Sequence, residues 1–139
     1  MANLVSVENV SKSFGLKTLL DGVSLGVQTG DRIGVVGLNG GGKSTLLRSL
    51  SKVLPPRSGT VLLNGREISG MRPKAFAREV GFLAQSSIAP EGITVHELVS
   101  RGRYPYQSVL HQWSDDDDEQ VSVAMERTNI SALATRRVA

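Results

Sequence analysis

The most informative stretch of this sequence reads Gly37-Leu-Asn-Gly-Gly-Gly42-Lys43-Ser44. It satisfies the P-loop pattern, in which a glycine and four further residues precede glycine, lysine and serine. Glycines let successive backbone N–H groups approach phosphate oxygens without a Cβ in the way, and a following helix adds the positive end of its dipole. The pattern therefore predicts a binding site for a nucleoside triphosphate.

The side chains at the end of this stretch have distinct predicted roles. Lys43 brings a positive charge to the β- and γ-phosphates, and the Ser44 hydroxyl is a ligand for the Mg²⁺ that accompanies the nucleotide. Thr45 is placed to reach the α-phosphate side. We expect ATP and Mg²⁺ as ligands, and the predicted cofactor-binding residues of this stretch are Gly37, Asn39, Gly40, Gly41, Gly42, Lys43, Ser44 and Thr45.

The segments on either side of the loop fit this interpretation. Ile33-Gly-Val-Val36 is short, apolar and non-alternating, which predicts a strand buried on both faces of a parallel sheet. Apolar residues then recur at helical spacing from Lys43 to Leu54, and Pro55-Pro56 ends the pattern. A strand, a glycine turn and a helix therefore follow in the order that a P-loop requires, which indicates an α/β protein.

Further local signals predict the remaining elements. Alternating apolar residues predict antiparallel strands at 5–10 and 23–27. A further strand is predicted at 60–63, and the dipeptide Asn64-Gly65 that follows it predicts a two-residue hairpin turn. A short helix is expected at 73–79 and another buried strand at 80–84, ending at Gln85.

Two helix starts are predicted from capping boxes, one with Thr94 and Glu97 and one with Ser114 and Asp117. The first helix is expected to run to about Arg101. The acidic run from Asp115 to Glu119 is interpreted as the solvated first turn of the second helix. A metal site built from these carboxylates is the alternative, although adjacent acids on a helix point in different directions.

Composition narrows the class of protein. The 139 residues fit one domain, and the absence of Cys excludes disulfides, thiolate zinc sites and thiol catalysis, with the cytoplasm as the default compartment. Apolar runs are too short for a membrane span, and the first residues lack the basic region of a signal peptide. The net charge of +3 comes from a basic excess around the glycine-rich loop, and aromatics are only 4% of the residues. We therefore expect no direct nucleic-acid partner.

Beyond the P-loop, the chain resembles the ATP-binding cassette (ABC) family from Leu4 to Val138. Residues 10–15 and 20–25 resemble the region in which that family stacks an aromatic ring on adenine, which gives this role to Phe14; a core Phe on a strand is the alternative. Val80-Gly-Phe-Leu-Ala-Gln85 resembles the family's Q-loop. The resemblance implies that Gln85 reaches Mg²⁺ and the attacking water, whereas a lone Gln after a strand is otherwise a surface residue.

Residues 93–106 are similar to the segment that follows the Q-loop in importers of iron–siderophore complexes. The resemblance implies an ATPase subunit that lies at the inner face of the cell membrane, with a transmembrane permease and a second ATPase subunit as partners. The implied fold is a P-loop NTPase core, incomplete here, with an N-terminal antiparallel β-subdomain and the start of a helical subdomain. Residues 1–139 would then be the N-terminal part of one nucleotide-binding domain.

Three elements of the family are missing from this sequence: an LSGGQ-like signature, an apolar run ending in Asp-Glu (Walker B) and a switch histidine. We therefore assign no catalytic residue and expect the 139-residue polypeptide to bind ATP without turning it over. Two alternatives stay open. Residues 30–43 also look like soluble ABC-F translation factors, and the chain could be an inert truncated product.

Overall fold

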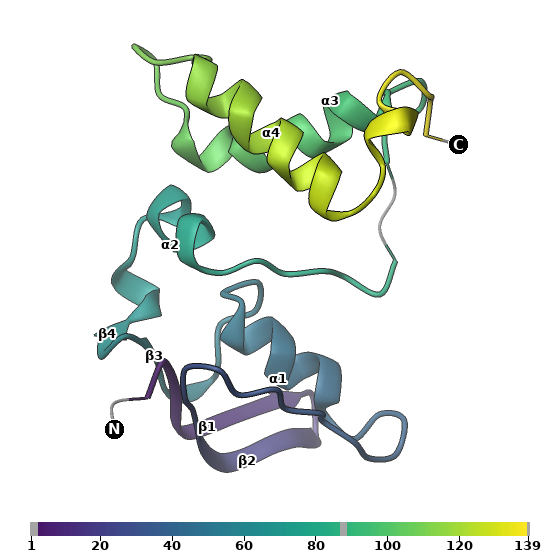
Figure 1. Ribbon diagram of the computed structural model, residues 1–139. Coiled ribbons are helices and arrows are strands. Elements are labelled where there is room, and N and C mark those ends of the chain that lie inside the picture. Colours follow the sequence, from purple (N-terminus) through teal and green to yellow (C-terminus); the bar gives the residue numbers. More distant parts are fainter. Residues whose placement is uncertain (1–2, 87–88, 139) are drawn as a thin grey trace. The chain divides into compact units, whose positions relative to one another are not determined.

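The computed structural model describes residues 3–86 and 89–138. The chain divides into two compact units, Met1–Arg72 (unit 1) and Pro73–Ala139 (unit 2). All of the strands lie in unit 1, whereas the described part of unit 2 consists of helices and loops (Figure 1).

Unit 1 is built on a four-stranded antiparallel sheet with the strand order β2-β1-β3-β4. The strands are β1 (Val5–Phe14), β2 (Lys17–Val27), β3 (Ser58–Leu63) and β4 (Arg66–Glu67), and a short 3-10 helix, η1 (Ile68–Gly70), follows. The predicted antiparallel strands are therefore confirmed, and the first two are longer than expected. Asn64 and Gly65 join β3 to β4 with φ values of 50° and 73°, which confirms the predicted hairpin turn.

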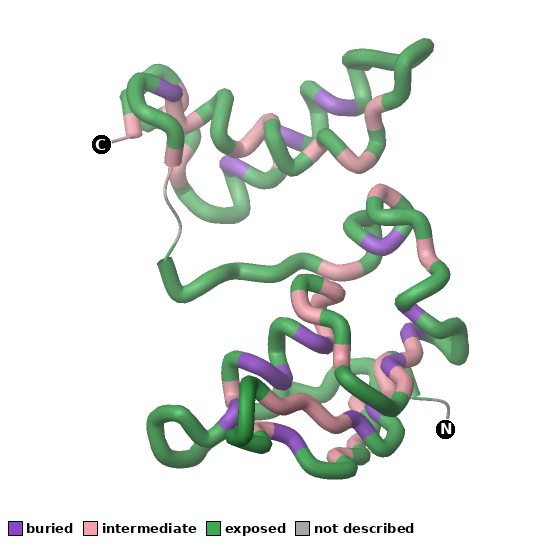
Figure 2. Tube along the Cα trace, turned by 180° about the vertical axis from the view of Figure 1, so that it is seen from behind, coloured by how far each residue is buried: buried purple, intermediate pink, exposed green. Residues whose placement is uncertain are grey.

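The core of unit 1 lies between the sheet and helix α1 (Lys43–Leu50). Val7 pairs with Leu25 on one side and with Val61 on the other, so the inward positions of three strands meet in one row. Leu46 of α1 is also buried. Figure 2 shows buried stretches both in the helix and in the strands of this unit. The buried apolar residues of unit 1 are Val7, Val10, Leu20, Leu46, Val61, Leu63 and Ile68.

Helix α1 is shorter than predicted. It ends at Leu50 and not at Leu54, because Lys52 takes a left-handed conformation with a φ of 60°. The N–H groups of Val53 and Leu54 both donate to the carbonyl of Arg48, which closes the end of the helix. The apolar residues Val53 and Leu54 therefore keep the helical spacing although they lie beyond the end of the helix.

Two predicted buried strands are not formed. Residues 33–36 and 80–84 have no regular secondary structure, and Val36 is 92% exposed. No backbone hydrogen bond joins 33–36 to another segment in the described ranges. A strand is stabilised by the ladder that it shares with a neighbour, and these segments have no such neighbour among the described residues. The prediction of strands at both places was therefore wrong.

Unit 2 contains α2 (Pro73–Glu79), α3 (Val95–Ser100), η2 (Arg101–Tyr106), α4 (Asp115–Arg127) and η3 (Ser131–Leu133). The predicted helix at 73–79 and both predicted capping boxes are confirmed. The segment containing Pro105 continues α3 as a 3-10 helix. The buried apolar residues of unit 2 are Phe76, Ile93, Val121 and Met125. Near the end of the chain, Val138 N donates to Ile93 O at 2.9 Å. No helix within 3–86 or 89–138 has the length and apolar character to cross a bilayer.

Candidate nucleotide-binding site

The predicted P-loop leads directly into α1 and is held closed by its own lysine. Lys43 is the first residue of the helix, and its Nζ donates to the carbonyls of Gly37 and Leu38 at 2.7 and 2.8 Å. Gly41 N donates to Leu38 O at 3.1 Å, which forms a tight turn inside the loop. Hydrogen bonds from the Lys43 ammonium group therefore join the end of the loop to its beginning.

Of the last two glycines before Lys43, Gly42 cannot be replaced without a clash and Gly41 has little room for a side chain. A Cβ on Gly42 would lie 2.5 Å from the carbonyl oxygen of Leu19, and one on Gly41 would lie 3.0 Å from that of Leu38. Gly42 also has a φ of 90°, which L side chains rarely adopt. Gly42 is therefore required for the packing of the loop against β2, while Gly40 and Gly41, which are exposed and carry no side chain, fit a bound nucleotide phosphate.

The N-terminus of α1 is open. Gly42 is its N-cap and supplies no side-chain acceptor, and the first turn contains no acidic residue. Leu46 N donates to Gly42 O, whereas the N–H groups of Lys43, Ser44 and Thr45 have no acceptor among the described residues. Three unsatisfied donors and the helix dipole point out of this end, which is an arrangement suited to an anion.

The hydroxyl side chains that follow differ in accessibility. Ser44 is exposed, so its Oγ can reach a bound cation. Thr45 is only 8% exposed, and its carbonyl accepts a hydrogen bond from Ser49 Oγ at 2.9 Å. The exposure of Ser44 suits its predicted role as a Mg²⁺ ligand, and the α-phosphate role of Thr45 stays a prediction.

Phe14 lies at the end of β1 with 53% of its surface exposed, so it is not a core residue of the described chain. Lys12 Nζ lies 5.7 Å from the centroid of the ring and also donates to Pro55 O at 2.8 Å. A cation over one face leaves the other face of the ring for a planar partner. The exposed ring is compatible with the predicted stacking on adenine.

Gln85 is exposed and lies in unit 2, whereas the P-loop lies in unit 1. Its role as a Mg²⁺ ligand therefore stays a prediction. No group of three or more His, Asp and Glu side chains suited to a metal ion occurs within 3–86 and 89–138.

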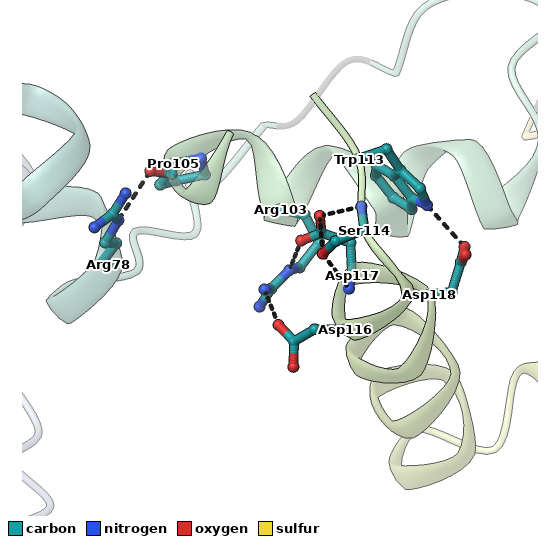
Figure 3. Close-up of polar contacts among 8 residues, drawn as sticks. All are labelled: Arg78, Arg103, Pro105, Trp113, Ser114, Asp116, Asp117 and Asp118. Atoms are coloured by element: carbon teal, nitrogen blue, oxygen red, sulfur yellow. Dashed lines mark hydrogen bonds and ion pairs between the residues drawn. The ribbon is translucent and has the colours of Figure 1, made fainter. Parts of the chain in front are cut away.

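The acidic run of unit 2 is a capped helix start, as predicted, and it also holds an arginine (Figure 3). Ser114 N and Oγ both donate to Asp117 Oδ2 at 3.0 Å, while Arg103 Nε donates to Asp117 Oδ1 at 2.6 Å. Arg103 also pairs with Asp116 at 2.8 Å. The hydrogen bond from Arg103, followed by those from Ser114, lowers the pKa of Asp117. Sequence reasoning missed this pairing, because Arg103 comes from a different helix.

The same arginine stacks on an aromatic ring. The guanidinium groups of Arg103 and Arg78 lie 4.1 and 5.2 Å from the centroid of Tyr106. Arg78 Nε also donates to Pro105 O at 2.9 Å (Figure 3). These contacts tie α2, η2 and α4 together, so the acidic residues serve the packing of unit 2.

A glycine-rich loop followed by a helix with an uncapped N-terminus is what a P-loop ATPase family requires. The comparison with known families decides which family this is. The family model described as "ABC transporter" matches residues 20–139. The chain belongs to this family. The expected P-loop NTPase fold is thereby confirmed, since solved members of the family share it.

Among individual relatives, this ABC protein is 45% identical over 134 residues to a Bacillus subtilis (strain 168) protein described as "Probable siderophore transport system ATP-binding protein". That match covers 96% of this chain and 49% of the relative. It is 40% identical to the ferric enterobactin transport ATP-binding protein of Escherichia coli (strain K12), covering 94% of this chain and 48% of the relative. The chain thus spans about half the length of the curated relatives that it matches.

A solved structure of a nucleotide-free ATP-binding cassette from an ABC transporter is similar to this chain with a TM-score of 0.75. The two are 29% identical, and the match covers 98% of this chain and 58% of that one. The fold of this chain is therefore similar to that of an ABC ATP-binding cassette.

Proposed function

We propose that this chain binds ATP with Mg²⁺ through its P-loop, as part of an ATP-binding subunit that energises the import of an iron–siderophore complex. The observation that carries the proposal is the open N-terminus of α1 behind a glycine loop whose backbone cannot accept a Cβ at Gly42. The relatives described as siderophore and ferric enterobactin transport proteins support the substrate class.

Each residue of the loop contributes a separate interaction. The unsatisfied N–H groups at the start of α1 would donate to phosphate oxygens, and Lys43 would move its ammonium group from two carbonyls to the phosphates. Phe14 would stack on the base. When bound, Mg²⁺ would neutralise part of the phosphate charge, with Ser44 and Gln85 as the residues that would hold it.

The proposal includes partners and a location. ABC ATP-binding subunits of import systems act on a membrane permease, so we propose a permease subunit and a second ATPase subunit as partners. The protein would then lie at the cytoplasmic face of the cell membrane. The likeness of residues 30–43 to ABC-F proteins finds no counterpart in the relatives described above, and co-purification with ribosomes, not membranes, would overturn the transporter assignment.

Isothermal titration calorimetry of the chain with Mg-ATP tests the binding site directly. Lys43→Ala removes a charge-assisted hydrogen bond to phosphate, which contributes about 1.5–3 kcal/mol, so we expect the affinity to fall roughly 10- to 100-fold. Arg48→Ala is the matched control, because this substitution also removes one positive charge from α1, at a residue that is exposed.

Far-UV circular dichroism establishes that all three proteins are folded to the same extent. We expect Arg48→Ala to retain the affinity of the parent within about twofold, since long-range charge effects at an exposed site are small. Equal affinity of the parent and Lys43→Ala would remove the basis for the P-loop assignment.

A further inference from the structure

A second lysine lies against the loop, and it comes from a different element. Lys17 is the first residue of β2 and pairs with Phe14 across the β1–β2 hairpin. A Cβ placed on Gly40, in the middle of the loop, would lie 3.4 Å from Lys17 Nζ. The ammonium group of Lys17 therefore lies close to Gly40 of the loop, and Lys17 itself is the strand partner of the candidate base-stacking residue Phe14.

Unlike Lys12 and Lys43, Lys17 has no hydrogen-bond acceptor for its ammonium group among the described residues. Lys43 donates to two loop carbonyls, and Lys12 donates to Pro55 O. The side chain of Lys17 is exposed and makes no hydrogen bond or ion pair with any residue in the described ranges. Two cations from different elements therefore lie at the same loop, Lys43 at the carbonyls of Gly37 and Leu38 and Lys17 near Gly40, and neither has an anionic partner among the described residues. The pair of lysines thus raises the attraction of the loop for a polyanion.

The register of the β1–β2 hairpin fixes the position of Lys17 relative to Phe14. Directly paired residues on antiparallel strands project from the same face, so Phe14 and Lys17 face the same side of the hairpin. One short hairpin therefore brings both an exposed aromatic ring and a cation to the loop. This is the combination that a nucleotide needs at its two ends, a ring for the base and charge for the phosphates.

We propose that Lys17 is a second phosphate-binding cation of this site and that it favours nucleotides with more phosphates. The inference rests on the proposed function, because it needs the loop to bind a nucleotide. In the nucleotide complex, Lys17 Nζ donates a hydrogen bond to a phosphate oxygen in addition to the contacts made by Lys43. Its contribution grows with the charge of the ligand, so it is largest for ATP, smaller for ADP and smallest for AMP.

The test compares Lys17→Gln with Arg57→Gln by calorimetry, using Mg-ATP, Mg-ADP and AMP at low salt. Both substitutions remove one positive charge from an exposed side chain of unit 1, but the Arg57 side chain forms no hydrogen bond or ion pair with the described residues of the loop. We expect Lys17→Gln to weaken ATP binding about 3- to 10-fold and AMP binding less than twofold. Lys17→Arg should keep most of the affinity, because it retains the charge.

Salt provides an independent readout. The difference between the parent and Lys17→Gln should shrink as the salt concentration rises from about 50 to 500 mM, because exposed charges are screened. If Lys17→Gln and Arg57→Gln bind ATP equally well while Lys43→Ala binds weakly, the inference about Lys17 is wrong and the proposed function stands. If the parent binds no nucleotide, both are wrong.

Discussion

The helix starts of α1 and α4 use opposite chemistry. At α4 the N-cap Ser114 and the third residue Asp117 satisfy each other's backbone groups, and four aspartates occupy the first turn. At α1 the N-cap is Gly42, and the first helical residue is the cation Lys43. Both helices have a positive N-terminal dipole, but only α4 neutralises it with its own side chains.

This difference indicates which helix start is available to a ligand. A capped N-terminus has used its donors within the protein, as α3 also does with Thr94 and Glu97. An uncapped N-terminus keeps its donors for something outside the chain. The contrast therefore separates a structural helix start in unit 2 from a binding helix start in unit 1.

The largest expected effect comes from Gly42→Ala. An L side chain at a φ of 90° and a Cβ at 2.5 Å from Leu19 O should destabilise unit 1 by about 2 kcal/mol or more. The same clash moves the start of α1, so nucleotide affinity should fall as well. Hydrogen exchange of residues 17–27, followed by mass spectrometry, measures the stability, and calorimetry measures the affinity.

Gly30→Ala is the matched control for this substitution. Gly30 has a φ of 88°, close to that of Gly42, but a Cβ there would meet no atom within 4 Å. We expect it to show the cost of backbone strain alone, about 1 kcal/mol, with nucleotide affinity retained. Equal effects of the two variants on affinity would show that the close fit at Gly42 does not shape the site.

A smaller effect is expected at the capped helix. Ser114→Ala removes the acceptor for Asp117 N and a donor to its carboxylate, which should cost about 1 kcal/mol and lower the melting midpoint by a few degrees. The only tryptophan of the chain, Trp113, precedes this residue and donates to Asp118 at 2.9 Å. Its fluorescence therefore follows the unfolding of this helix start.

Ser122→Ala makes the same chemical change in the exposed middle of α4. Alanine favours a helix interior over serine by a few tenths of a kcal/mol, so we expect no loss or a slight gain. If Ser114→Ala also left the midpoint unchanged, the capping box would not stabilise α4, and the comparison with α1 would lose its meaning.

The smallest effect is expected from pH. The hydrogen bond from Arg103 lowers the pKa of Asp117, and the bond from the Thr94 backbone lowers that of Glu97. A carboxyl group with a lowered pKa in the folded state stabilises the protein above its unfolded pKa of about 4 and stops doing so as pH falls through the folded value. The Trp113 melting midpoint should therefore fall as the solution is acidified below about pH 4.

Asp117→Asn separates this contribution from general acid denaturation. The variant should be less stable than the parent near neutral pH, and the two should converge in acid because Asp117 is then protonated in both states. Asp115→Asn is the control, since the side chain of Asp115 makes no hydrogen bond or ion pair with a described residue. A constant difference between Asp117→Asn and the parent at all pH values would contradict the assigned role of the ionised carboxylate.

Local elements of the fold could be predicted from the sequence because their causes lie within a few residues. The capping boxes at Thr94 and Ser114 need one side chain and one backbone group three residues away. The Asn64-Gly65 turn needs only two residues that tolerate a positive φ. Such signals are complete within the printed sequence.

The unformed strands at 33–36 and 80–84 illustrate what local patterns leave out. Their apolar composition fits a buried strand, but burial and pairing depend on distant segments. Ile33 and Val36 are 57% and 92% exposed where a buried strand was expected. The composition of a segment shows that it is able to form a strand, whereas the presence of a pairing neighbour determines whether the strand forms.

The candidate site shows the same division. The P-loop residues are contiguous and could be predicted, including the glycines whose close approach the structure demonstrates. Lys17 was not predicted as a site residue, because its contact with the loop depends on how the β1–β2 hairpin meets Gly40. The only available signal in the sequence was the short spacing between Phe14 and Lys17, which the structure shows to be paired across the hairpin. Arg103 was missed for the same reason, since Asp116 and Asp117 come from another helix.

The clamp formed by Lys43 on the carbonyls of Gly37 and Leu38 makes phosphate binding an exchange reaction. The ammonium group loses two neutral acceptors when it gains anionic ones, so the number of hydrogen bonds hardly changes and only their strength does. In return, the empty loop is already ordered, and less conformational entropy is lost when the ligand arrives. The affinity lost in Lys43→Ala will accordingly combine a missing contact with a loosened loop, so it is an upper limit on the contact itself.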